Sequence, residues 1–403
     1  MHIASIVSLI VLVGSGLTWV WGAVKNWKFN KNSFIVFVSI ILTSIVMFAY
    51  CFEAKNDGLD ISRHYQLLDQ MKQGGWKFTQ EESQYSSLFI YNTFAYLVAV
   101  GGNYAWLQTI PLIIDFAVFL YIYLDIIKRN NRKSNCISLK DSLFVFFLWI
   151  STFGLKLAIT GIRCVLAVAL CALAVYQEYI LKKNKILPIA LYVIALFIHN
   201  FALWVIAIRL TLFFKKKGFI AIALFLVIAF GEAAVQFLYD NVSNEYLKFV
   251  FSRILETFSS FQWGSDYLQK SGTAFFMMWG CFIILTLYLL YMSNYMRKYY
   301  QQERNLNKQH YTNNLSDFCY TVGLMGLPMA FNYLYMERYM YLVAWALLMI
   351  AYYYLKTVRT QRLQQEKHFW IMSGMSLVCL FVVFFNDIYL FMVNYIGFYF
   401  LAM

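Results

Sequence analysis

The sequence predicts an all-α, polytopic integral membrane protein with ~11–14 transmembrane or re-entrant helices. Hydrophobic residues make up 61% of the 403 residues, and charged residues make up only 13%. A soluble globular protein carries about 25% charged residues, so this chain has too few of them to coat a water-exposed surface. Apolar stretches of ~20 residues, the length that crosses a hydrocarbon core of ~30 Å, also recur along the chain. We therefore expect one transmembrane domain over residues 1–403.

The apolar stretches give an ordered set of expected spans. The first one lacks a preceding basic segment and is longer than the apolar region of a secretory signal, so we interpret it as an uncleaved span. Three stretches fit the expected length poorly, namely 87–100, 186–214 and 388–403. The strong spans lie near residues 3–24, 34–52, 104–127, 142–160, 163–181, 218–237, 273–296, 317–336, 338–355 and 369–386.

The positive charges predict the orientation of these spans. Short loops rich in Lys and Arg stay on the cytoplasmic side of a membrane. Six basic segments together hold 22 of the 33 Lys and Arg residues. The net charge of +13 is then explained mainly by orientation, and we expect no nucleic acid as a partner. The basic segments are residues 25–31, 128–140, 182–185, 215–217, 297–308 and 356–367.

If all six basic segments are cytoplasmic, each pair must be separated by an even number of crossings. The stretch 186–214 is then too long for one upright helix, and a single crossing would place 215–217 on the wrong side. We predict two short half-helices hinged at His199 and Asn200. The same reasoning makes 87–100 an in-plane or re-entrant helix on the outer side, between a first outer loop at 53–86 and the next span. A second outer loop is expected at 238–272.

Charged residues at the outer edge of a membrane are costly, so each is a candidate functional residue. Arg163 opens a span in GIRCVLAVALCALAVY with no acidic residue within a helical turn, and it can hold an anion. His199 lies at the tip of the two half-helices, in ALFIHNFALWV. At 1.5 Å per residue, the helices that lead to Arg163 and His199 end at similar depths in the outer half of the bilayer. The alternatives are headgroup anchoring for Arg163 and a satisfied core position for His199.

Further candidates lie at other outer turns and in the first outer loop. Arg338 follows Glu337 in ERYMYL, and these neighbours point to different sides of a helix, so Arg338 is a second candidate anion ligand and Lys156 a third. The first outer loop combines acidic, basic and aromatic side chains, which suits a sugar because carboxylates accept hydrogen bonds from hydroxyls and aromatic rings stack on pyranose faces. Asp57, Asp60, Arg63 and Tyr65 are its candidate residues.

Several kinds of chemistry lack their motifs in this sequence. There is no Walker A motif, GxGxxG, HExxH or GxSxG, which weighs against nucleotide-driven pumps, zincins and serine hydrolases of the motif-bearing types. The seven Cys residues form no CxxC and lie mostly inside apolar runs, so neither a disulfide framework nor a zinc site is indicated. We expect no cofactor and a metal-independent reaction.

At these residues the chain resembles the EpsG family and, more broadly, the Wzy-type polysaccharide-repeat polymerases of bacterial membranes. The resemblance rests on DGLDISRHY and EESQYSSLFIYN near the first outer loop, and on a late Arg followed by aromatics in ERYMYL. Its most specific element is G-I-R-x-x-L-A, then a basic turn, then a half-helix that ends in F-x-H, here GIRCVLA to LFIH. One position departs from the family's pattern. Phe201 lies two residues after His199, where the family has a small or hydroxyl residue.

The resemblance implies a multi-pass glycosyltransferase of the bacterial cytoplasmic membrane, with a GT-C-like architecture and an active site that faces the exterior or periplasm. Its implied reaction joins undecaprenyl-pyrophosphate-linked oligosaccharide units into a polymer. Arg163, with Arg338, would bind the leaving pyrophosphate, because guanidinium forks match phosphate oxygens. His199 is the first candidate for the base that deprotonates the acceptor hydroxyl, and Asp60 is the second. Implied partners are membrane lipids, a flippase and a chain-length regulator.

Two other functions fit the same residues. A glycosyltransferase that adds one sugar from a polyprenyl-phosphate donor would use a carboxylate of the first outer loop, for which Asp57 or Asp60 could serve. A transporter or flippase for the lipid-linked glycan is the alternative from another class. The sequence shows neither inverted repeats nor charged residues along midplane faces, which weighs against a transporter. A membrane O-acyltransferase is a more distant possibility.

Overall fold

Helices make up nearly all of the regular structure in the computed structural model of this chain. It describes residues 28–51, 60–83, 85–130, 136–138, 161–181, 186–213, 217–244, 263–304, 311–330 and 333–359, with scattered residues of 10–25, 145–149 and 247–255. The expected spans 369–386 and 388–403, and most of 3–24 and 142–160, lie outside the described residues. Three described helical stretches are long and apolar enough to cross a membrane, Trp106–Arg129, Ile162–Leu181 and Met278–Tyr299. This agrees with a helical membrane protein.

The chain divides into two compact units. The first unit comprises residues 1–206 and 347–403, and the second comprises 207–346. The helices are α2 (Lys31–Tyr50), α3 (Asp60–Glu81), α4 (Phe89–Gly101), α5 (Trp106–Asn130), α8 (Ile162–Tyr176), η1 (Gln177–Leu181), α9 (Ile186–Leu196), α10 (Ala202–Thr211), α11 (Lys217–Asn241), α13 (Trp263–Arg304), α14 (Tyr311–Met329) and α15 (Tyr333–Arg359). Two short strands, β1 (Lys28–Asn30) and β2 (Cys136–Ser138), are the exception to the all-α prediction.

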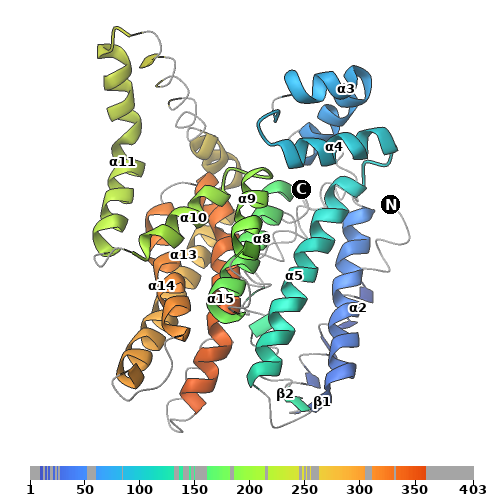
Figure 1. Cartoon of the computed structure of the whole chain (residues 1–403), viewed down its shortest axis with the longest axis vertical. Coiled ribbons are helices and arrows are strands. Elements are labelled where there is room, and N and C mark those ends of the chain that lie inside the picture. Colours follow the sequence, from blue (N-terminus) through green and yellow to red (C-terminus); the bar gives the residue numbers. More distant parts are fainter. Residues whose placement is uncertain are drawn as a thin grey trace. The chain divides into compact units, whose positions relative to one another are not determined.

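One end of the first unit gathers segments that the charge pattern assigned to the cytoplasm. Strands β1 and β2 pair antiparallel, which joins segments 25–31 and 128–140 (Figure 1). Near the C-terminal end of α5, Asp125 accepts hydrogen bonds from Arg129 and from Tyr176 of α8, both at 2.6 Å. The C-terminal ends of α5 and α8 therefore lie together at this end, from which α8 continues through η1 to segment 182–185.

The opposite end of the first unit holds α3 and α4 (Figure 1). Gln108, near the start of α5, donates to the carbonyl of Ala49 in α2 at 2.7 Å and accepts from Tyr65 of α3 at 2.6 Å. Helix α3 occupies much of the segment that we predicted as the first outer loop, so this segment has a helix that we did not predict. The helix is amphipathic, because Ile61, His64, Leu68 and Met71 recur at helical spacing and are buried. Gly75, at φ 68°, kinks it.

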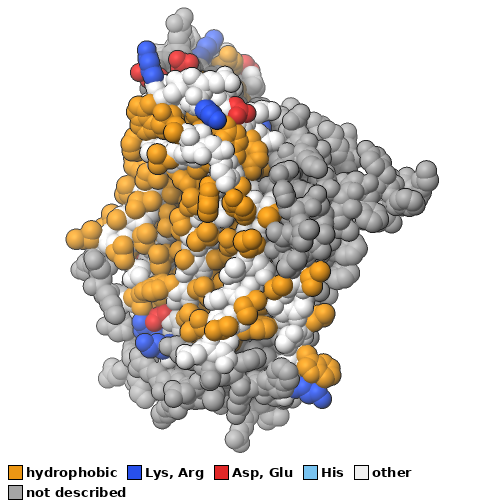
Figure 2. All heavy atoms as spheres, turned by 90° about the vertical axis from the view of Figure 1, so that its right-hand side faces the viewer, with side chains coloured by type: hydrophobic (Ala, Val, Ile, Leu, Met, Phe, Trp, Pro, Cys, Tyr) orange, Lys and Arg blue, Asp and Glu red, His pale blue; other side chains and the backbone are white. Residues whose placement is uncertain are grey.

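A broad apolar surface lies between these two ends. Figure 2 shows apolar side chains over the middle of one face, with Lys, Arg, Asp and Glu side chains gathered toward its two ends. Val36, Ile40 and Met47 of α2 and Ile113 of α5 are among the exposed apolar residues. A monomeric soluble protein rarely exposes so much apolar surface, and a lipid-facing belt explains it.

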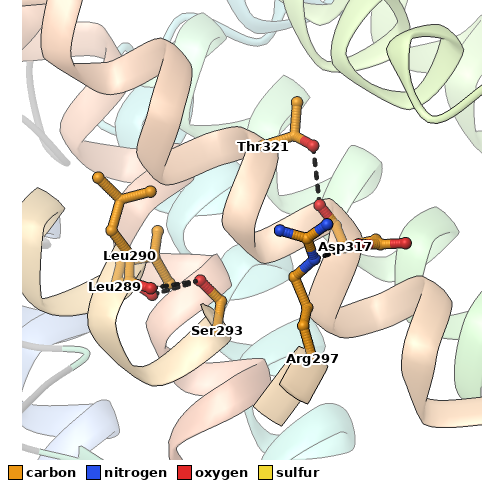
Figure 3. A network of polar contacts seen from close by, with 6 residues as sticks. All are labelled: Leu289, Leu290, Ser293, Arg297, Asp317 and Thr321. Carbon is orange, nitrogen blue, oxygen red and sulfur yellow. Dashed lines mark hydrogen bonds and ion pairs between the residues drawn. The ribbon is translucent and has the colours of Figure 1, made fainter. Parts of the chain in front are cut away.

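The second unit is built around the packing of α13 and α14. Gly323 lies so close to α13 that a Cβ atom there would be 2.8 Å from a Leu290 side-chain carbon, so only glycine permits this approach. Arg297 of α13 bonds Asp317 of α14 at 2.5 Å (Figure 3). The guanidinium carbon of Arg297 also lies 4.2 Å from the centroid of the Tyr320 ring. This ion pair fixes the two helices where α13 enters the basic segment 297–308. Helix α11 reaches Asn241 and α13 begins at Trp263, so both extend into the expected second outer loop.

Candidate functional site

Arg163 is the second residue of α8, at the end of the first unit opposite the basic segments. Gly161 precedes the helix and contributes no side-chain cap, and the first turn of α8 has no acidic residue. The free N–H groups of a helix N-terminus give it a partial positive charge, which favours anions. The Arg163 side chain is half-buried. Its guanidinium and the helix terminus therefore add positive potential at one place.

The guanidinium of Arg163 lies on two tyrosine rings. Its Cζ is 3.8 Å from the centroid of Tyr85, in the turn before α4, and 5.1 Å from the centroid of Tyr91, in the first turn of α4. Such cation–π contacts contribute about 0.5–2 kcal/mol each. In the part of the chain that the structure describes, no carboxylate pairs with Arg163. The site thus holds a cation that an anionic ligand can neutralise.

Two other arginines of the described chain form ion pairs instead. Arg129 and Arg297 each bond a carboxylate, those of Asp125 and Asp317, and each lies at the start of a basic segment. Arg297 also stacks on a tyrosine, Tyr320. It differs from Arg163 chiefly in having the carboxylate of Asp317, which Figure 3 shows. Each of these two arginines thus has an acidic partner. Arg163 does not fit that pattern.

His64 joins the two tyrosines to form a ring triad. The centroids of His64, Tyr85 and Tyr91 are 5.6, 5.6 and 5.7 Å apart, close to an equilateral triangle. The Tyr91 hydroxyl is hydrogen-bonded to Nδ1 of His64 at 2.8 Å. Both His64 and Tyr91 are buried. The ring triad, defined as these three residues, therefore forms a packed base under Arg163.

The environment of His64 keeps its imidazole neutral. Burial, together with the positive charges of Arg163 and Arg63, lowers the pKa of His64 to about 3. A protonated imidazole would repel the guanidinium of Arg163. At neutral pH the ring triad therefore adds no charge of its own to the site.

A buried asparagine fixes the turn that carries Tyr85. The Asn92 amide donates to the carbonyl of Thr79 at the end of α3, and its oxygen accepts from the Ser83 hydroxyl at 3.1 Å. The same hydroxyl accepts from the backbone N–H of Tyr85 at 3.2 Å. Asn92 and Thr79 are 0% exposed, so water cannot replace these bonds. Asn92 therefore ties α3, the turn and α4 together.

The predicted break in 186–214 is confirmed. Helix α9 ends at Leu196 and α10 begins at Ala202. The carbonyl of Phe197, in the break, accepts the backbone N–H of Tyr91 at 3.3 Å. The first N–H groups of α4 have no partner within their own helix, and Leu88 gives no side-chain cap. The break therefore caps α4 and touches the ring triad.

His199 lies in this break and is buried. The backbone N–H of Phe201 donates to Nδ1 of His199 at 3.0 Å. Nδ1 must therefore be the unprotonated nitrogen, and the neutral ring carries its proton on Nε2. In this arrangement Nε2 is a hydrogen-bond donor. A ring whose Nδ1 is engaged in this way is not a ready proton acceptor, which argues against our first choice for the base.

The other predicted site residues fall into three groups. Arg63 is exposed on α3, and Tyr65 bonds Gln108. Arg338 and Glu337 are half-buried on α15, within the second unit, and remain predicted ligands. Asp60 begins α3 one helical turn before His64, while its side chain, Asp57 and Lys156 lie outside the described residues. The structure therefore brings Arg163 and the His199 break to the same helix, α4.

Sequence reasoning missed the ring triad and Asn92. Tyr85 and Tyr91 lie in EESQYSSLFIYN, which carries part of the resemblance, but they are two of 31 tyrosines, most of which fit an interfacial role, and were not singled out. Asn92 was the detectable one, because it is a polar residue in the apolar run YNTFAYLVAV. Among the described residues, no three His, Cys, Asp or Glu side chains lie together as a metal ion requires.

Comparison with known proteins gives no relative for this chain: no family model, no curated protein and no solved structure matches it. The function is therefore argued from the site.

Proposed function

We propose that the protein is a glycosyltransferase of the bacterial cytoplasmic membrane that polymerises undecaprenyl-pyrophosphate-linked oligosaccharide units at the outer face. The observation that carries the proposal is Arg163, a guanidinium on two tyrosine rings without a carboxylate partner among the described residues. It lies at the end of the first unit opposite β1 and β2, whose segments carry the inward-directing charge. A diphosphate headgroup at the outer leaflet is an anion that would meet it there.

In the proposed reaction, the hydroxyl oxygen of one oligosaccharide attacks the anomeric carbon of another. The bond from that carbon to the pyrophosphate oxygen breaks, and undecaprenyl pyrophosphate leaves with the electron pair. Negative charge grows on the leaving oxygen in the transition state, so a fixed guanidinium there lowers the barrier. Arg163 supplies this charge in our proposal, and Arg suits the task better than Lys because its fork matches two phosphate oxygens.

The proton of the attacking hydroxyl needs a base. Since Nδ1 of His199 is already bonded to the Phe201 N–H, we no longer assign His199 the role of the base and keep it as a residue of the site. Asp60, at the start of α3 and one turn before His64, is then our candidate for the base. Arg338 is retained as a second ligand for the diphosphate. A flippase that delivers the lipid-linked units and a chain-length regulator are the expected partners.

Reconstitution tests the proposal. The purified full-length protein is placed in liposomes with lipid-linked oligosaccharide extracted from cells that lack it, and products are separated on gels and weighed by mass spectrometry. We expect a ladder spaced by one repeat unit, with release of undecaprenyl pyrophosphate. Arg163→Gln should abolish the ladder, and Lys72→Gln, an exposed charge on α3, should keep it.

Other outcomes of the same assay identify the alternatives. Addition of one monosaccharide from a polyprenyl-phosphate donor, without a ladder, would establish the single-sugar transferase. Movement of lipid-linked oligosaccharide across the liposome membrane without lengthening would establish the transporter. Either result would overturn the polymerase.

A further inference from the structure

The contact between Arg163 and Tyr85 uses a flat face of the guanidinium and does not use the N–H donors at its edge. A guanidinium has two flat faces and an edge, and all five of its N–H donors lie in the plane of the edge. Its Cζ lies over the ring of Tyr85 at 3.8 Å, so it is a face that contacts the tyrosine. In the described part of the chain, none of the edge donors of Arg163 bonds another residue. The stack on Tyr85 thus uses none of these donors. Tyr91, whose ring stands at 80° to that of Tyr85, faces one side of the edge, and the other sides are left for a ligand.

This presentation depends on the orientation of the tyrosine rings. Tyr85 and Tyr91 meet at an interplanar angle of 80°, which makes a corner whose two walls both contact the guanidinium. A tyrosine ring can rotate about its side-chain bonds unless its hydroxyl is held. The Tyr91 hydroxyl is held by His64 Nδ1, and its backbone N–H is held by the Phe197 carbonyl. Tyr91 is therefore fixed at both ends.

From this we infer that His64 and Tyr91 form a positioning pair: their hydrogen bond fixes the aromatic corner that aims the edge of Arg163 at a diphosphate. The inference rests on the proposed function, in which Arg163 binds that diphosphate. It assigns to His64 a role in binding without contact with the ligand. Neither residue takes part in bond making or breaking.

The role requires that His64 accept a hydrogen bond and stay uncharged. The short contact between the Tyr91 hydroxyl and Nδ1 meets the first requirement if the phenol donates. Burial and two nearby arginines meet the second, because they hold the pKa of His64 near 3. An asparagine side chain can place its carbonyl oxygen close to the position of Nδ1, so His64→Asn keeps the acceptor while removing the ring.

The test measures binding of inorganic pyrophosphate to the purified full-length protein by calorimetry. We expect His64→Ala and Tyr91→Phe each to weaken binding by about 3- to 10-fold, the effect of one lost hydrogen bond. His64→Asn should stay within about twofold of wild type for the same reason. The double variant His64→Ala/Tyr91→Phe should be no weaker than either single variant, because both remove the same bond. Lys72→Gln is the control for an α3 substitution.

A general loss of structure would give a different pattern. It would lower the fraction of protein that binds, whereas loss of positioning changes Kd at full stoichiometry. In the glycosyl-transfer assay, substitution of His64 or Tyr91 should mainly raise KM for the lipid-linked donor. Equal weakening by His64→Asn and His64→Ala, or additive effects in the double variant, would overturn the positioning pair.

The two proposals fail separately in this experiment. If Arg163→Gln abolishes pyrophosphate binding and the His64 and Tyr91 variants bind normally, the positioning pair is wrong and the proposed function stands. If wild type and Arg163→Gln bind pyrophosphate equally, the diphosphate site is wrong, and the positioning pair falls with it.

Discussion

The guanidinium carbon of Arg163 lies 3.8 Å from the centroid of the Tyr85 ring, with no carboxylate partner in the described part of the chain. Arg297 has a similar ring contact, 4.2 Å from Tyr320, and is also neutralised by Asp317. Arg297 joins two packed helices through its ion pair, whereas Arg163 leaves a positive charge for a ligand. This contrast supplies the first prediction and its control.

Substitution of Tyr85 should lower the activity only when the aromatic ring is removed. Tyr85→Phe keeps a ring under Arg163 and should retain most of the activity. Tyr85→Leu removes a cation–π contact of about 0.5–2 kcal/mol and should lower kcat/KM by about 2- to 30-fold. Steady-state kinetics with the lipid-linked donor measures both. Tyr320→Leu is the matched control, and a loss of activity there as large as in Tyr85→Leu would contradict a site-specific role.

Amide substitutions of His199 should distinguish a donor from a base. A glutamine can place its amide nitrogen near the position of Nε2, whereas an asparagine reaches only the position of Nδ1. We expect His199→Gln to be about tenfold more active than His199→Asn, because it alone restores the donor. A base could be replaced by neither amide. Equal inactivity of the two variants would therefore return His199 to the role of base.

Acid should destabilise the first unit through His64. Its folded-state pKa of about 3 is below the ordinary value of 6.5, so the unfolded chain binds more protons between these values. The stabilisation is complete above pH 6.5 and is lost as the pH falls toward 3, by up to about 1.4 kcal/mol per pH unit. Thermal unfolding of the detergent-solubilised protein between pH 7.5 and 4.5 measures this. His64→Asn should flatten the curve, and parallel curves for the two proteins would contradict the assignment.

Removal of the Asn92 amide should destabilise the outer end of the first unit. Asn92→Leu leaves the Thr79 carbonyl and the Ser83 hydroxyl without this partner, at a cost of roughly 1–3 kcal/mol for each buried group. We expect a lower melting temperature and lower activity, with wild-type Kd for pyrophosphate in the folded fraction at low temperature. Thr93→Leu is the control, because the Thr93 hydroxyl donates to the Phe89 carbonyl of its own helix and, in the described part of the chain, to no other element. Equal destabilisation by both variants would contradict the role of Asn92.

Much of the helical pattern was predictable because hydropathy reports burial in lipid directly. The expected spans 104–127 and 163–181 correspond to α5 and to α8 with η1. The break in 186–214 followed from length and charge parity. Helix α3 was not foreseen, because its apolar residues occur singly at helical spacing among charged ones and give no apolar run. The β1–β2 pairing joins strands over 100 positions apart, and no local pattern indicates it.

Residues of the site could be predicted only where a charged or titratable side chain lies in an apolar run of the sequence. Arg163 and His199 stood out because a charged or titratable residue in an apolar run needs a reason. The ring triad did not, since its tyrosines resemble membrane anchors and His64 resembles a solvated loop residue until α3 buries it. The roles of Asp57 and Lys156 remain predictions, because both lie outside the described residues.

The most direct test of the central claim is the product of an Arg163→Lys variant in cells that depend on this chain for their polymer. A lysine keeps the positive charge but has neither the bidentate fork nor the flat face that stacks on Tyr85. We predict single repeat units on lipid and no polymer ladder, with the variant present in the membrane at the wild-type level. A wild-type ladder would contradict it.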